Sequence, residues 1–80
     1  MNKEEFGTYV KVVGIQLSRI REPEGLTRHQ LEKKSGIHHN TILHYENGNA
    51  SPTLRLLAAI ANGMGYDIRV EFVKRSESHD

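Results

Sequence analysis

The sequence predicts a mainly α-helical fold, with four helices followed by one C-terminal β-strand. Three observations indicate it. Apolar residues recur at spacings of 4, 3, 4 and 3 from Phe6 to Ile20, which is the period of an amphipathic helix. The stretch 26–48, LTRHQLEKKSGIHHNTILHYENG, has the capping and glycine pattern of two short helices joined by a turn. From Tyr66 to Phe72 apolar residues alternate with charged ones, as in a strand with one buried face.

Length and composition set limits on the class of protein. A chain of 80 residues makes one domain with a small core, so a partner subunit is expected. It has no cysteine, which excludes disulfides and thiolate chemistry and fits a reducing cytoplasm. We find no signal peptide and no apolar run near the roughly 20 residues of a membrane span, so a cytoplasmic protein without membrane contact is expected. The net charge of +1 supports a polyanionic partner only weakly.

The first helix is predicted over about 6–21. Glycines and β-branched residues near its start lower helix propensity, so a strand over 9–13 stays as the alternative. Pro23 then stops the helix. The apolar stripe consists of Phe6, Val10, Val13, Leu17 and Ile20.

Three further helices are predicted, over 28–35, 39–46 and about 53–62. Thr27 and Gln30 form a capping box, and Gly36 ends the first of the three. The first two form a helix-turn-helix. Its inward residues are Leu26, Leu31, Ile37, Ile42 and Tyr45, and its outward ones are Arg28, Lys33, His39, Asn40, Leu43 and His44. Hydrogen-bonding side chains on the exposed face of a second helix suit the groove of DNA.

The predicted strand, residues 66–73, presents Tyr66, Ile68, Val70 and Phe72 on one face. A single strand cannot satisfy its own backbone, and no second convincing strand is apparent. We therefore predict that it pairs with its copy as an intersubunit antiparallel sheet in a homodimer. The alternative is an extended arm that folds back on the helices of its own chain. Residues 1–75 then form a single domain, and 76–80 a flexible tail.

A family resemblance covers about residues 17–64. It rests on Gly25-Leu26-Thr27, Leu31, Ser35-Gly36-Ile37, Thr41-Ile42, Glu46-Asn47-Gly48 and Ser51-Pro52-Thr53-Leu54. In this order and without gaps, these residues resemble the Cro and phage-repressor (XRE-type) helix-turn-helix family. The resemblance implies a compact lambda-repressor-like bundle that binds palindromic operator DNA as a dimer. Family members usually have a fifth helix where this chain has its predicted strand. A helix-turn-helix domain of this size that ends in a C-terminal strand looks most like the antitoxins of bacterial toxin–antitoxin pairs.

The resemblance also implies which residues contact DNA. The base-reading positions fall on His39, Asn40 and His44, with Leu43 able to meet a thymine methyl group, and the phosphate-contacting positions fall on Arg28, Thr41 and Asn47. An asparagine side chain can form a paired hydrogen bond with adenine, and a neutral histidine can donate or accept at a base edge. The alternatives are a solvated helix face and, for Arg28, a surface ion pair.

Two residues depart from the family pattern. Glu32 stands where a small alanine is usual, so the helices lie further apart or Glu32 turns outward. His38 replaces the usual serine or threonine cap, which weakens the start of the next helix by roughly 1 kcal/mol unless another group substitutes.

The predicted function is a sequence-specific DNA-binding repressor, the antitoxin of a toxin–antitoxin module, which autoregulates its operon and binds a cognate toxin. The alternatives are a stand-alone phage-type or restriction-controller regulator, and a protein-interaction module without DNA binding. No pattern of catalytic carboxylates or phosphate-binding glycines indicates an enzyme, and no cofactor is expected. No metal is expected from His38, His39 and His44, because their helical offsets do not bring three rings together.

Overall fold

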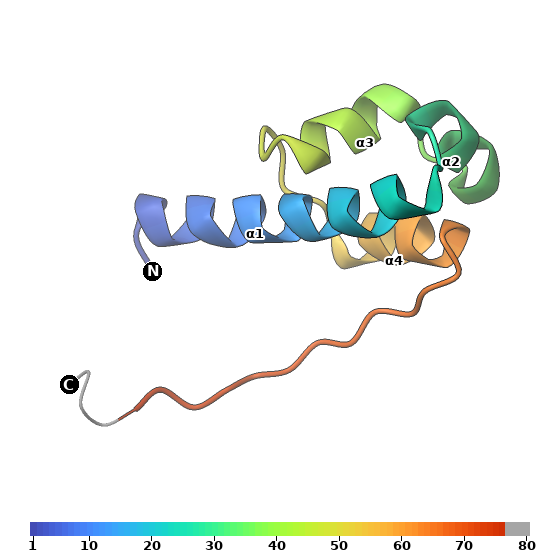
Figure 1. Cartoon of the computed structure of the whole chain (residues 1–80). Coiled ribbons are helices and arrows are strands. Elements are labelled where there is room, and N and C mark those ends of the chain that lie inside the picture. Colours follow the sequence, from blue (N-terminus) through green and yellow to red (C-terminus); the bar gives the residue numbers. More distant parts are fainter. Residues whose placement is uncertain (77–80) are drawn as a thin grey trace.

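The computed structural model describes residues 1–76 and has four α-helices in this part of the chain. They are α1 (Lys3–Arg21), α2 (Arg28–Ser35), α3 (His39–Glu46) and α4 (Leu54–Gly63), with the short 3-10 helix η1 (Glu22–Glu24) after α1. Figure 1 shows α2 and α3 on one side of α1 and α4 on the other. The predicted four helices are confirmed. The first starts earlier than expected, and the alternative of a strand over 9–13 is wrong.

Short-range hydrogen bonds determine where the helices begin and end. The Thr27 hydroxyl accepts from the backbone N–H of Gln30 at 3.1 Å, and the Gln30 side chain accepts from the Thr27 N–H at 2.9 Å, which is the predicted capping box. Gly36 ends α2 with a φ of 77°, a conformation that favours glycine. Thr53 is the cap of α4 and not its first residue, because its hydroxyl accepts from the N–H of Leu56.

The hydrophobic core lies between the helices, where α3 packs against α1 and α2, and α2 packs against α4. It consists of Leu17, Leu31, Ile42, Tyr45, Ile60 and Met64. Burial of Leu31, Ile42 and Tyr45 confirms the predicted inward face of the helix-turn-helix, whereas Leu26 and Ile37 are only partly buried at its edge. Phe6 was expected in the apolar stripe of α1 but is exposed, because the first turns of α1 extend beyond the other helices (Figure 1).

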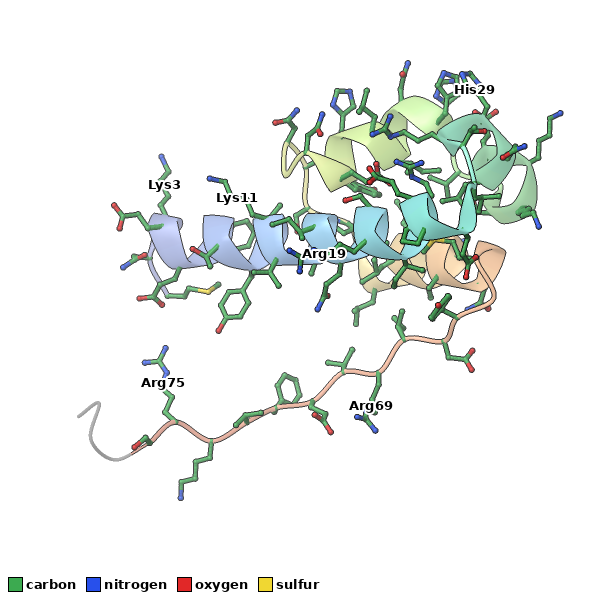
Figure 2. All side chains as sticks on the ribbon, in the orientation of Figure 1. Lys3, Lys11, Arg19, His29, Arg69 and Arg75 are labelled. Carbon is green, nitrogen blue, oxygen red and sulfur yellow. The ribbon has the colours of Figure 1, made fainter. Side chains whose placement is uncertain are left out.

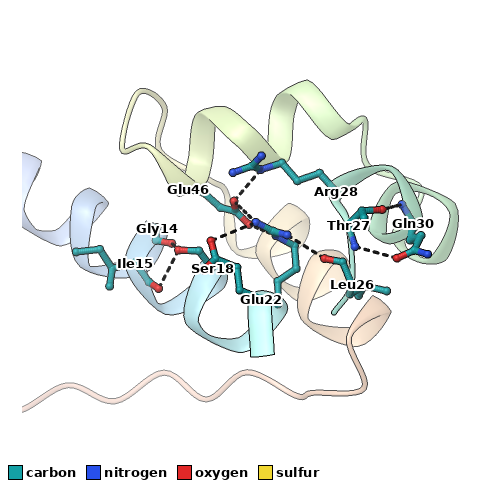
Figure 3. Close-up of polar contacts among 10 residues, drawn as sticks. Gly14, Ile15, Ser18, Glu22, Leu26, Thr27, Arg28, Gln30 and Glu46 are labelled. Atoms are coloured by element: carbon teal, nitrogen blue, oxygen red, sulfur yellow. Dashed lines mark hydrogen bonds and ion pairs between the residues drawn. The ribbon is translucent and has the colours of Figure 1, made fainter. Parts of the chain in front are cut away.

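A buried carboxylate joins three helices. Glu46, at the end of α3 (Figure 3), has a side chain only 2% exposed and accepts from Arg21 of α1 at 2.6 and 3.0 Å. The Nε of Arg28, the first residue of α2, donates to the same carboxylate at 2.8 Å. Arg21 also donates to the backbone oxygen of Leu26, and its hydrogen bond with Glu46 raises its pKa. The cluster of Arg21, Arg28 and Glu46 therefore sets how α3 lies on α1 and α2.

Gly14 allows α1 to approach the end of α3 closely. A Cβ atom built on Gly14 would lie 2.3 Å from the backbone oxygen of Tyr45 and 2.8 Å from that of Glu46. Both obstacles are backbone atoms, so a side-chain rotation cannot relieve the clash. The glycine that weakens the helix prediction is thus required by packing.

The C-terminal segment, residues 66–76, is extended but contains no strand. The N–H of Tyr66 donates to the oxygen of Ala61, and none of the described residues from 67 to 75 makes a backbone–backbone hydrogen bond. In Figure 2 the ribbon of the part carrying Arg69 and Arg75 runs apart from the helices, and the Arg75 side chain lies 4.0 Å from the Glu5 carboxylate of α1. The predicted strand 66–73 is not found within one chain, and its pairing with a second copy stays a prediction.

The last residues of the chain and its helices bear on the predicted flexible tail and on membrane contact. Of the predicted flexible tail 76–80, all but Ser76 lies outside the described residues, and Ser76 has a contact of its own. In the part of the chain that the structure describes, no helix has both the length and the apolar character needed to cross a bilayer.

Replacing Gly14 with alanine should destabilise the fold by about 1 to 3 kcal/mol, because the added methyl group must displace backbone atoms. Gly7 is the matched control, since it lies in the same helix with nothing within 4 Å of the position that a Cβ atom would take. Gly7→Ala should stabilise by about 0.5 to 1 kcal/mol through helix propensity. Urea denaturation measures both changes, and a Gly14→Ala variant as stable as Gly7→Ala would contradict the close approach.

Replacing Glu46 with glutamine should cost about 3 kcal/mol or more, because it leaves the buried Arg21 without its counter-charge. Glu22→Gln is the control: this carboxylate also lies near Arg21, at 3.6 Å, but its side chain is 67% exposed. Its loss should change the free energy of unfolding by less than about 0.5 kcal/mol. Equal effects of the two substitutions would show that the buried pair does not hold the helices.

Candidate nucleic-acid interface

The four predicted base-reading residues share one face of α3. His39 and Leu43 are half-buried, whereas Asn40 and His44 are exposed. Asn40 and His44 are four positions apart and therefore lie on the same side of the helix. Their side chains make no hydrogen bond within the described chain. The opposite side of α3 is fixed in the core by Ile42 and Tyr45. The helix therefore presents free donors and acceptors from an anchored backbone.

The predicted phosphate-contacting residues have different surroundings. Arg28 forms an ion pair, as the alternative anticipated, but its partner is the buried Glu46 and not a surface carboxylate. The pair uses the Nε atom of Arg28, and the Nη atoms make no hydrogen bond to the described residues, so they remain available as donors. Thr41 is half-buried on α3, and the exposed Asn47 directly follows this helix.

A shallow hollow between α2 and α3 brings some of these residues together. Its lining consists of Arg21, Thr27, Arg28, His29, His39, Asn40 and Leu43. Arg28 is thus placed beside three of the four base-reading candidates. The other predicted residues, His44, Thr41 and Asn47, do not line the hollow and lie further along α3 and in the loop after it.

The two departures from the family pattern compensate one another at the start of α3. The Glu32 carboxylate accepts from the backbone N–H of His39 at 2.9 Å, and the Nδ1 atom of His38 accepts from the N–H of Asn40 at 3.1 Å. Both N–H groups would otherwise lack partners at a helix N-terminus. Glu32 therefore turns toward α3 and not outward, and it supplies a second acceptor where His38 replaces the usual serine or threonine cap.

Glu32 also holds the ring of His39. The Nδ1 atom of His39 lies 2.6 Å from the Glu32 Oε1 atom. This side-chain hydrogen bond, together with the backbone one, lowers the pKa of Glu32 from its ordinary value. The ring of His38 stacks on that of His39 at a centroid distance of 4.2 Å. The His39 side chain is therefore positioned before any partner binds.

His29 was not among the predicted site residues, and Figure 2 shows it at the outer side of α2. Its ring centroid lies 3.8 Å from that of His39. The structure does not bring together His38, His39 and His44, the three histidines considered for a metal site. Among the described residues, a different set comes together: one potential ligand atom from each of His29, Glu32 and His39 lies within 4.8 Å of the other two. The spacing of three residues between His29 and Glu32 on one helix was the available signal.

Comparison with known proteins identifies the family. The profile of the helix-turn-helix family matches residues 17–70, which include α2, α3 and α4. An HTH-type transcriptional regulatory protein of Picrophilus torridus is 32% identical over 74 residues, covering 92% of this chain and 24% of that protein. An uncharacterized HTH-type transcriptional regulator of Sinorhizobium fredii is 33% identical over 55 residues, covering 69% of this chain and 71% of that protein.

The chain thus spans about a quarter of the first of these relatives, 24%, and most of the second, 71%. No solved structure gives a significant match. The profile match extends over more than half of the chain and includes both helices of the predicted motif and the turn between them. The chain belongs to the helix-turn-helix family.

Proposed function

We propose that this protein is a sequence-specific DNA-binding repressor of transcription that reads operator DNA with α3. One observation carries the proposal: α3 exposes Asn40 and His44 on one side, while its other side is fixed by the core and by the cluster of Arg21, Arg28 and Glu46. A rigidly held helix with unsatisfied polar groups suits the major groove of B-DNA, which is about 12 Å wide. The names of the two relatives as transcriptional regulators support it.

In the proposed complex the side chains divide into two groups. Asn40 pairs with the N6 and N7 edge of an adenine, His39 and His44 bond to other base edges, and Leu43 contacts a thymine methyl group. Contacts to the DNA backbone orient the protein without reading sequence.

These backbone contacts come from Arg28, Thr41 and Asn47. Glu46 neutralises part of the Arg28 charge, but Arg21 shares the same carboxylate. The two arginines therefore share one buried carboxylate, the further carboxylate of Glu22 near Arg21 is exposed, and both arginines line the hollow between α2 and α3.

The operator is palindromic because the repressor is a homodimer. The support is the C-terminal segment, in which Val70 is 55% and Phe72 is 99% exposed and the described residues 67–75 make no backbone–backbone hydrogen bond. Pairing of residues 66–73 with a second copy would give partners to the backbone groups along the shared edge and place Tyr66, Ile68, Val70 and Phe72 beside their copies on one face. Two copies of α3 then meet half-sites one helical turn, about 34 Å, or a multiple of it apart.

The repressor is further proposed to be the antitoxin of a toxin–antitoxin pair, cytoplasmic, and a regulator of its own operon. The sequence resemblance and the extended apolar segment after α4 support this assignment. The gene next to this one would encode a small toxin. Co-expression of this protein should restore growth to cells that express the neighbouring gene, and the two proteins should purify together. A neighbouring gene product that is harmless and does not bind this protein would contradict the antitoxin assignment and favour the stand-alone regulator.

Replacing Asn40 with alanine should weaken binding to the DNA upstream of this gene by about 1 to 3 kcal/mol per half-site, because one base contact is lost. Binding to random DNA should not change. Gln16→Ala, which removes an exposed carboxamide from α1, is the control and should bind both DNAs like the unmodified protein. Gel shifts at one stated salt concentration measure this. Equal losses of Asn40→Ala on both DNAs would contradict base reading.

Replacing Phe72 with serine should convert the dimer to monomers in sedimentation experiments. Phe72 is 99% exposed in a single chain, so its loss matters only if a partner covers it. Arg69→Ser is the control, since Arg69 lies on the other face of the alternating segment and its side chain is 84% exposed. A mass that is unchanged by Phe72→Ser would tell against pairing through this segment.

A further inference from the structure

The three side chains His29, Glu32 and His39 form a compact cluster at the junction of α2 and α3. One potential ligand atom from each lies within 4.8 Å of the other two. We propose that this cluster binds one divalent transition-metal ion of the Zn²⁺ type, with water in the remaining position. Two imidazole nitrogens and one carboxylate oxygen are a donor set that Zn²⁺ prefers, and three protein ligands leave one coordination position open.

The backbone brings the three ligands together. His29 and Glu32 are three residues apart on α2 and therefore lie on the same side of this helix. The turn at Gly36 then returns the chain so that His39, the first residue of α3, faces them. In a tetrahedral zinc site with bonds of about 2.1 Å, ligand atoms are about 3.4 Å apart. The Glu32 Oε1 and His39 Nδ1 atoms, 2.6 Å apart as a hydrogen-bonded pair, would separate to about this distance when the ion replaces the proton between them.

The surroundings orient the ligands in advance. The backbone N–H of His39 donates to Glu32 at 2.9 Å, which fixes the carboxylate, and the ring of His38 stacks on His39 at 4.2 Å. Contacts of this kind around the ligands commonly raise metal affinity. His29 is exposed and Glu32 and His39 are half-buried, so an ion from solvent has access to the cluster.

Helix capping alone does not account for the cluster. It explains why Glu32 lies against His39, but it assigns no role to His29. The His29 ring lies 3.8 Å from that of His39 and makes no hydrogen bond within the described chain. A metal ion between them gives His29 a partner and links α2 to α3. Because the ion binds the folded chain, it raises the melting temperature with metal concentration.

The test is a calorimetric titration of the full chain with Zn²⁺ in a buffer that does not chelate metals. We expect saturation at one ion per chain and a rise in melting temperature that EDTA reverses. His29→Ala and Glu32→Gln should each lower the affinity at least about tenfold. His44→Ala removes an exposed histidine of α3 outside the cluster and should bind like the unmodified protein.

Two results would overturn the proposal: no saturable binding at one ion per chain, or equal affinities of His29→Ala and His44→Ala. His29 is exposed and not hydrogen-bonded within the described chain, so circular dichroism should show an unchanged fold for His29→Ala. Co²⁺ gives a second readout, because three-ligand tetrahedral binding produces visible absorption that both cluster variants should lose. Neither measurement uses DNA, so the metal site stands or falls separately from the proposed repressor function.

Discussion

The ion pair of Arg21 with Glu46 is the contact on which the presentation of α3 depends. Both side chains are at most 8% exposed, and two short hydrogen bonds join them. Removing two charges from water is costly, and this pair offsets the cost only because its geometry satisfies both groups. Apolar packing alone would hold the helices together in several similar arrangements. The two hydrogen bonds between Arg21 of α1 and Glu46 of α3 favour a single arrangement of these two helices. The backbone of α1 at Gly14 can then lie directly against the end of α3.

Much of the fold was predictable because its signals are local. The capping box of Thr27 and Gln30 and the left-handed Gly36 lie within a few residues of the ends that they define. The face of α3 followed from helical period together with the apolar Ile42 and Tyr45. The Arg21–Glu46 contact was not predictable, since its residues are 25 positions apart on different helices and no spacing rule connects them. Gly14 was likewise treated as a weak helix former because its obstacle belongs to another helix.

At the candidate site, the sequence identified the parts but not how they interact. Glu32 and His38 were each interpreted as unfavourable departures, yet together they supply acceptors for the first N–H groups of α3. The histidine cluster was missed because it joins two helices, while spacing rules apply within one. The C-terminal segment could not be predicted from one chain for a different reason. A strand is defined by its hydrogen-bonded partner, so the alternation of residues 66–73 predicts a property of an assembly and not of one chain.

The central claim, that α3 is the surface that meets DNA, is tested most directly by NMR spectra of the ¹⁵N-labelled chain during addition of the DNA upstream of its gene. The account predicts that the largest shifts of amide signals occur at Asn40, His44 and Asn47, with little change at Ala58 and Asn62 of α4. The largest shifts in α4, with α3 unaffected, would contradict it.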